Sequence, residues 1–102
     1  MLHRPFGKLG WNVSAIGLGT WNFGNQWGEL DDATVWATVR AAVDAGINLV
    51  DTAESYGIPN GFSEMRLGLA LAGLGLVILL IYLCLRDRLL RRLEDARLPQ
   101  YC

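Results

Sequence analysis

The first half of the chain consists of short apolar runs separated by glycine-rich and polar stretches. The runs AIGLG (15–19) and INLV (47–50) have the length of short buried strands; the first ends in a glycine and a glycine precedes the second. Between them, residues 33–45 repeat apolar side chains at helical spacing on one face, namely Val35, Val39, Ala42 and Val43. The order strand, helix, strand predicts an α/β fold with a parallel sheet or barrel.

Glycines and polar residues mark the turns around the first of these strands. Residues 3–14 predict a short hairpin, in which Gly7 and Gly10 can take the positive φ that tight turns need. Residues 20–30, TWNFGNQWGEL, are rich in aromatic side chains and glycine and predict a loop. A hairpin, a strand and a loop therefore precede the first helix.

Residues that begin and end helices flank the helical segment. Asp31 or Asp32 is the expected N-cap, because a carboxylate there accepts hydrogen bonds from free amides and favours the positive end of the helix dipole. Gly46 lies where a left-handed residue ends a helix. Beyond the second strand, IPNGFS (58–63) predicts a turn, and Ser63 is the expected cap of a second helix.

Residues 67–85, LGLALAGLGLVILLIYLCL, contain no charged side chain and allow three interpretations. The first is a helix over 64–73, a Gly-Leu-Gly break at 73–75 and a third buried strand over 76–83. The second is a transmembrane helix, because the run approaches the roughly 20 residues that span a bilayer. The third is a segment with no evolved structure, in which leucine favours helix locally.

An arginine-rich segment follows the uncharged run. Residues 86–98 predict an amphipathic helix with an apolar stripe of Leu89, Leu90, Leu93 and Ala96. Such a helix lies either on a soluble core or at a membrane interface after a span. The change in composition divides the chain into residues 1–73 and an apolar, then arginine-rich tail over residues 74–102.

Composition and charge narrow the function classes. The 102 residues suit one small domain, and the net charge of −1 gives no electrostatic case for nucleic acid. The charge is −3 over residues 1–66, zero over 67–85 and +2 over 86–102. Cys84 and Cys102 form neither a disulfide framework nor a metal-binding spacing, so no metal is expected. Because no secretory leader begins the sequence, we expect a cytoplasmic protein, with a membrane location as the alternative.

Candidate acid–base chemistry lies in NLVDTAESYG (48–57). Asp51 and Tyr56 stand five residues apart, directly after the apolar run that ends at Val50. A carboxylate and a phenol displayed at the end of a strand form half of a proton-transfer site. The alternative is a packing role for Tyr56 and a turn cap for Asp51.

Several blocks around this motif carry a family resemblance. LGWNVSAIGLGTWNFG, WGELDD, AAVDAGINLVDTAESYG and PNGFSE follow in order from about Leu9 to Gly73. They resemble the start of an aldo/keto reductase, covering about two thirds of this chain and about the first quarter of such an enzyme. The resemblance implies an incomplete (β/α)₈ TIM barrel, with an N-terminal hairpin and two βα units before the tail. It also implies NADPH-dependent reduction of a small carbonyl substrate, without metal.

The resemblance also implies roles for individual residues. Tyr56 would be the general acid that donates a proton to the carbonyl oxygen, and Asp51 would belong to the same hydrogen-bonded group. Gly19, Thr20 and Trp21 match the segment that lines the nicotinamide and substrate side of the pocket. The remaining tryptophans are expected to pack in the core or in loops: Trp11, Trp27 and Trp36.

Two further members of such a site are missing from this sequence. A phenol has a pKa of about 10 and needs a nearby cation to donate a proton near neutral pH. The resemblance implies a lysine after the third strand and a histidine after the fourth. The single lysine, Lys8, and the single histidine, His3, belong to the predicted hairpin, opposite the pocket, and Arg86 is no substitute for lysine. We therefore expect a truncated reductase that is inactive alone.

Three functions remain in competition. The first is a reductase fragment, in which residues 74–102 are read out of frame, a hypothesis that the nucleotide sequence decides. The second is a small single-pass or membrane-associated protein that uses residues 67–85, with its C-terminus in the cytoplasm. The third is a module whose exposed sheet edge docks on another chain.

Overall fold

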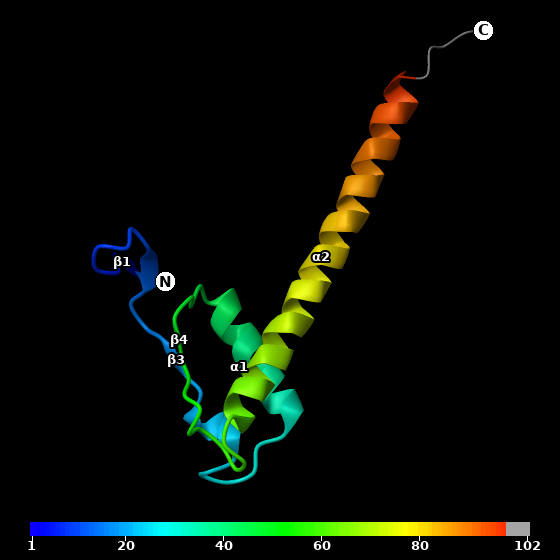
Figure 1. Ribbon diagram of the computed structural model, residues 1–102. Helices are drawn as coiled ribbons and strands as arrows, with labels where there is room; N and C mark the ends of the chain where they lie inside the picture. The colour runs from blue at the N-terminus through cyan, green and yellow to red at the C-terminus, as the bar shows by residue number, and fades with distance from the viewer. Residues whose placement is uncertain (98–102) are drawn as a thin grey trace, which may run out of the picture. The chain divides into compact units, whose positions relative to one another are not determined.

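The computed structural model describes residues 1–97 of the chain. They belong to two compact units, the first over Met1–Ala72 and the second beginning at Gly73. Figure 1 follows the elements in order: the strands and α1 belong to the first unit, and α2 continues into the second. Residue 98, the predicted end of the amphipathic helix, and Cys102 lie outside the described residues.

An antiparallel hairpin begins the chain. β1 (His3–Pro5) pairs with β2 (Asn12–Ser14). In the connection between them, Gly7 and Gly10 have φ angles of 56° and 70°, a region that residues with a side chain rarely adopt. The hairpin over residues 3–14 and the role of its two glycines are confirmed.

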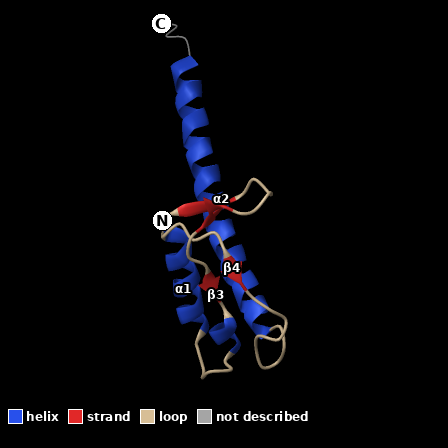
Figure 2. Ribbon diagram, turned by 90° about the vertical axis from the view of Figure 1, so that its left-hand side faces the viewer, coloured by secondary structure: helices blue, strands red, loops and turns tan. Residues whose placement is uncertain are grey.

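A strand–helix–strand unit follows the hairpin. β3 (Leu18–Gly19) and β4 (Val50–Asp51) pair in parallel, and α1 (Asp32–Asp44) makes the crossover that parallel strands require. Figure 2 shows the two short strands of this pair. The predicted order of elements is confirmed. Both strands are shorter than the predicted 15–19 and 47–50, since each has only one hydrogen-bonded neighbour within the described part of the chain.

Both ends of α1 carry the predicted signals. Asp31 is the N-cap, and its Oδ1 accepts a hydrogen bond from the Thr34 amide at 2.7 Å. Hydrogen bonding to Thr34 holds the pKa of the Asp31 carboxyl below its ordinary value, and the charge of Arg66 adds to the effect. Past the other end, Gly46 has a φ of 83°, and its amide donates to the Val43 carbonyl at 2.9 Å.

The buried apolar side chains of the first unit come from α1, from the start of α2 (Phe62–Arg97) and from the short 3-10 helix η1 (Trp21–Gly24) in the loop after β3. The apolar members of this core are Phe23, Val35, Val39, Ala42, Leu67 and Ala70. Val43, which was predicted to share the buried face, is 44% exposed. It follows Ala42 directly and is therefore turned by about 100° around the helix axis.

α2 is one continuous helix, which excludes the first of the three interpretations of residues 67–85 and corrects the role of Ser63. The third strand over 76–83 and the break at 73–75 are wrong, because a leucine-rich helix satisfies its backbone groups internally whereas a strand needs a neighbour. Ser63 does not cap the helix, because α2 begins one residue earlier. Its Oγ instead donates to the Thr20 carbonyl at 2.5 Å.

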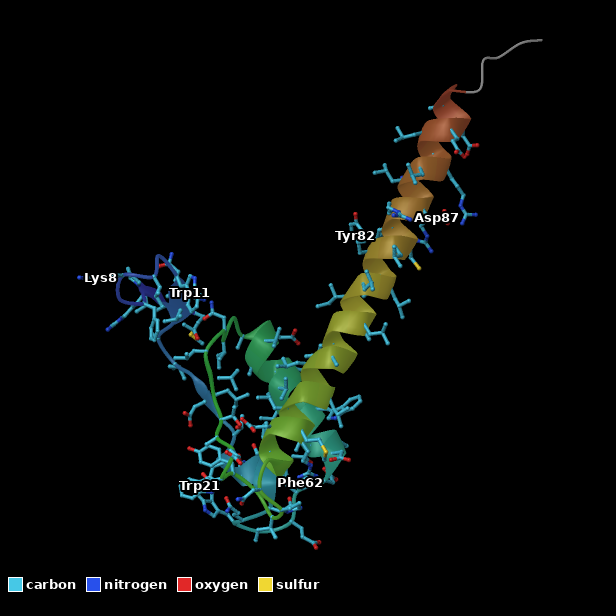
Figure 3. All side chains as sticks on the ribbon, viewed as in Figure 1. Lys8, Trp11, Trp21, Phe62, Tyr82 and Asp87 are labelled. Carbon is cyan, nitrogen blue, oxygen red and sulfur yellow. The ribbon has the colours of Figure 1, made fainter. Side chains whose placement is uncertain are left out.

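The part of α2 that lies in the second unit is exposed around its whole circumference. Every residue from Gly75 to Ala96 is exposed, and Figure 3 shows the side chains along this stretch. Residues 86–96 are helical, as predicted, but the predicted stripe of Leu89, Leu90, Leu93 and Ala96 is exposed as well. By length and composition, Phe62–Ala96 is long and apolar enough to cross a membrane, a test that some core helices of soluble proteins also pass.

Candidate active site

Two chain segments meet at the carboxyl end of the parallel strand pair. Gly19 lies opposite Asp51 in the ladder, and the next residue, Thr20, extends the contact. The Thr20 amide and Oγ1 both donate to the Asp51 carbonyl oxygen, at 3.1 and 2.8 Å. Thr20 is fully buried. The strand pairing and the hydrogen bonds to the Asp51 carbonyl thus bring together Gly19, Thr20 and Asp51, three of the five predicted site residues.

Tyr56 lies beside Asp51 because the chain turns directly after β4. The Tyr56 amide donates to the Ala53 carbonyl at 2.9 Å, and the Tyr56 hydroxyl donates to Asp51 Oδ2 at 3.3 Å. The negative charge of Asp51 raises the pKa of the Tyr56 phenol, and desolvation and the hydrogen bond act in the same direction. Asp51 therefore makes the Tyr56 hydroxyl a weaker acid than an ordinary phenol.

Trp21, the fifth predicted residue, covers the Tyr56 ring. The two rings are stacked, with centroids 5.3 Å apart and an interplanar angle of 9°. The Trp27 ring packs against the Trp21 ring, with centroids 4.9 Å apart and an interplanar angle of 46°. Trp21 Nε1 donates to Gln26 Oε1, and Gln26 Nε2 donates to the Ser55 carbonyl at 3.3 Å. The loops after β3 and β4 therefore share an aromatic and amide cluster.

Gln26 and Trp27 were not predicted as site residues. Trp27 is 69% exposed and adds its ring to an accessible aromatic surface, although we expected it only to pack. A signal was present in the sequence, because TWNFGNQWGEL places two tryptophans and three amide side chains directly after a strand. Trp11 and Trp36, also expected to pack, are exposed too, at 62% and 50%.

Two glycines allow the loops after β3 and β4 to touch. A Cβ on Gly24 would lie 2.4 Å from the Gly57 Cα, so that the backbone would have to shift to admit it. The Ile58 amide donates to the Gly24 carbonyl at 3.1 Å. Gly57 has a φ of 132°, a conformation open to glycine. The contact ties the loop that carries Trp21 to the segment that carries Tyr56.

The single lysine and the single histidine lie at the other end of the strands. His3 Nε2 is 3.1 Å from the carbonyl oxygen of Gly46, a residue that precedes β4, and Lys8 lies in the hairpin turn. Figure 3 shows Lys8 far from Trp21. Neither side chain lies beside Tyr56.

The described residues supply only part of what a dinucleotide needs. Trp21 has a partly exposed ring that a nicotinamide could contact. The Thr20 hydroxyl already donates to the Asp51 carbonyl. Among the cations of residues 1–72, Arg66 is bound by the loop after β3, Arg40 lies beside Asp44, and the others belong to the hairpin. These residues do not fit a dinucleotide on their own. Over residues 1–97, no three His, Cys, Asp or Glu side chains gather as a metal site would require.

The sequence matches the model of the aldo/keto reductase family over residues 15–78. The match covers more than half of the chain and includes β3, α1, β4 and the cluster around Tyr56. It continues a few residues beyond Gly73, where the resemblance was expected to fade.

Three relatives are each 48% identical to this chain. They are aldo-keto reductase YhdN of Bacillus subtilis (strain 168), over 76 residues (74% of this chain, 22% of the relative); D-threo-aldose 1-dehydrogenase of Pseudomonas sp, over 56 residues (55% and 16%); and the chloroplastic pyridoxal reductase of Arabidopsis thaliana, over 64 residues (56% and 17%). The chain spans about a fifth of the length of these curated relatives. Together with the family match, these identities show that the chain belongs to the aldo/keto reductase family.

Proposed function

We propose that this chain carries the proton-donating part of a carbonyl-reducing site. The observation that carries the proposal is the contact between the Tyr56 hydroxyl and Asp51 Oδ2 at the carboxyl end of β3 and β4. A phenol held there is placed to donate a proton to the oxygen of a carbonyl whose carbon accepts a hydride. Trp21 and Trp27 add flat apolar surface on which the body of a small substrate can lie.

The proposed substrate is a small aldehyde or ketone. The names of two relatives, an aldose dehydrogenase and a pyridoxal reductase, support this class of compound. The family generally uses NAD(P)H, which supports a nicotinamide cofactor as the hydride source, and NADPH is the form that we propose. The proposed location is the cytoplasm.

We further propose that this chain does not turn over by itself. A carboxylate beside a phenol raises the pKa of the phenol, whereas an acid that works near neutral pH needs a lower one. A nearby cation would supply that change, but Lys8 and His3 belong to the hairpin end of the first unit. In this proposal, Tyr56 lacks a neighbouring positive charge that would lower its pKa.

A chimera tests the proposal. Residues 9–73 of this chain replace the matching segment of YhdN from Bacillus subtilis, which restores the remainder of an aldo/keto reductase around them. We expect the chimera to oxidise NADPH with a small aldehyde. Tyr56→Phe should lower kcat/KM by about 10²–10⁴-fold, the contribution typical of a general acid.

Matched measurements complete the experiment. Trp11→Phe, an exposed aromatic change in the hairpin, should leave the activity of the chimera unchanged. The chain by itself should show no carbonyl-dependent NADPH oxidation. Turnover by the chain alone would overturn the view that it lacks an activating cation, and full activity of the Tyr56→Phe chimera would remove Tyr56 as the acid.

Membrane association through α2 is a second candidate function. Residues 67–85 carry no charge, Arg86 follows them, and residues 75–85 are exposed on all sides. Leu67 and Ala70, however, are buried in the first unit. The eleven exposed residues make about 16 Å of helix, whereas the hydrocarbon core of a bilayer is about 30 Å thick. A full span therefore requires the start of α2 to leave the core of the first unit.

Cell fractionation tests the membrane candidate. Recovery of the chain in membranes after carbonate extraction would support a span, with the arginine-rich end in the cytoplasm. Protein that is released by carbonate, or that collects as insoluble aggregate, would exclude it.

A further inference from the structure

Arg66 is a buried guanidinium that binds one loop at several points. Its side chain is only 7% exposed. Nη1 donates to the Phe23 carbonyl at 2.8 Å and to Asn25 Oδ1 at 3.0 Å, and Nη2 donates to the Leu30 carbonyl. Nε donates to Asp32 Oδ1 at 2.8 Å. Four hydrogen bonds from one side chain thus reach residues 23–32.

Charge pairing alone does not explain this arrangement. Within residues 1–97 its anionic partner is Asp32, whose side chain is 75% exposed, and an ion pair with an exposed carboxylate contributes little. The other three acceptors are neutral oxygens of the loop after β3. Because a planar guanidinium offers donors in fixed directions, it can hold several carbonyls at once, which a lysine ammonium does not reproduce.

The loop that Arg66 holds is the loop that carries Trp21. Asn25 has a φ of 64°, and its Oδ1 also accepts from the Leu30 amide at 3.0 Å, so that Arg66 and Asn25 close the loop together. From the same turn of α2, Ser63 binds the Thr20 carbonyl through its hydroxyl. The start of α2 therefore fixes the loop on both sides of Trp21.

We propose that Arg66 is a positioning residue of the candidate site: by binding the loop at Phe23, Asn25 and Leu30, it holds Trp21 flat against Tyr56. This proposal rests on the proposed function, in which Tyr56 of the stacked pair donates the proton. Its own test needs no catalysis, since the stack is a structural property of the chain.

The test follows the near-ultraviolet circular dichroism of the full chain in mild detergent. Trp21→Phe defines the signal that the stacked pair contributes. Arg66→Lys keeps the positive charge but loses the fixed set of guanidinium donors, and this variant should lose most of that signal. Asn25→Gly allows the left-handed backbone but removes the oxygen that accepts from Arg66, so this variant should lose part of the Trp21 signal. Asn25→Asp keeps an acceptor oxygen and should retain the signal.

Two controls separate positioning from general stability. Arg40→Lys changes an exposed arginine of α1 and should leave the signal unchanged. Far-ultraviolet spectra report whether each variant keeps its helices. An Arg66→Lys chain with intact helices and a full Trp21 signal would overturn the proposal, as would an Asn25→Gly chain indistinguishable from Asn25→Asp. Should the Tyr56→Phe chimera stay fully active, the proposed function fails while this result stands.

Discussion

At the scale of single residues, the candidate site consists of one negative charge beside one phenol. Asp51 accepts the hydrogen bond of Tyr56 and raises the pKa of that phenol. The sign matters, because the same contact that orients the hydroxyl also makes it a weaker acid. A cation placed beside the pair would reverse the effect, since positive charge favours the phenolate.

Removing the charge of Asp51 should therefore change how Tyr56 titrates. We expect Asp51→Asn to lower the pKa of Tyr56 toward its ordinary value of about 10. The measurement is tyrosinate absorbance against pH in a chain whose other tyrosines are replaced, Tyr82→Phe and Tyr101→Phe. Glu54→Gln, which removes an exposed carboxylate of the same loop, is the control and should leave the titration unchanged. An identical titration in Asp51→Asn would show that Asp51 does not govern the phenol.

The Asp31 cap makes a second prediction at this scale. Its pKa is lowered in the folded chain, so its contribution to stability is present above the unfolded value of about 3.9. The contribution disappears as the pH falls through the lowered folded value. Asp31→Ala should unfold at a lower temperature than the parent near neutral pH, and the difference should shrink in strong acid, where Asp31 loses its charge but keeps an acceptor oxygen.

Two further variants check the origin of that difference. Asp31→Asn keeps an oxygen for the Thr34 amide, so it should retain the helix while losing the acid-dependent change. Asp44→Ala, at the other end of α1, removes a negative charge from the negative end of the dipole and should not destabilise the helix. An equal loss in Asp31→Ala and Asp44→Ala would contradict the capping account.

At the scale of elements, the site depends on how two loops approach each other. The parallel pairing of β3 and β4 brings Gly19 and Asp51 side by side. The strands are too short to hold the loops beyond them, so the contact between Gly24 and Gly57 and the hydrogen bonds from the start of α2 do so. The geometry around Tyr56 therefore belongs to the loops and helices more than to the sheet.

Gly24→Ala should break this arrangement. The added Cβ would meet the backbone of Gly57 at 2.4 Å, and backbone cannot move aside as a flexible side chain can. Overpacking costs about 1–3 kcal/mol, and we expect the upper end of that range here. Gly19→Ala is the matched control, because its Cβ would meet nothing within 4 Å. Thermal unfolding should separate the two variants, and equal stability would rule out a tight contact between the loops.

At the scale of the whole molecule, the sequence predicts what depends on neighbours along the chain. The turn glycines, the Asp31 cap and the end of α1 at Gly46 follow from local backbone chemistry and are confirmed. The contacts of Arg66 were not predictable, because they join residues 34 to 43 positions apart and no periodicity records them. The state of residues 67–85 was also open, since a short apolar run suits a buried strand and a helix equally well.

The two parts of α2 should respond differently to the same substitution. Leu76→Gln, Leu80→Gln and Leu83→Gln together alter exposed side chains of the second unit, each of which would gain about 1.5–3 kcal/mol from burial in lipid or aggregate. We expect this variant to move from the pellet to the supernatant and to keep the near-ultraviolet signal of Trp21. Ala70→Gln introduces the same side chain at a site that is 2% exposed.

Because that site has no room for a longer polar group, Ala70→Gln should lose the Trp21 signal without becoming more soluble. We expect the parent chain to sediment because of the exposed apolar side chains of the second unit. The pair of variants thus separates that surface from the core that holds the site. If the triple glutamine variant lost the Trp21 signal, the first unit would depend on residues beyond Gly73. If it stayed in the pellet, the apolar surface responsible would lie in the first unit instead, where Trp27 and Ile58 are the most exposed large apolar side chains.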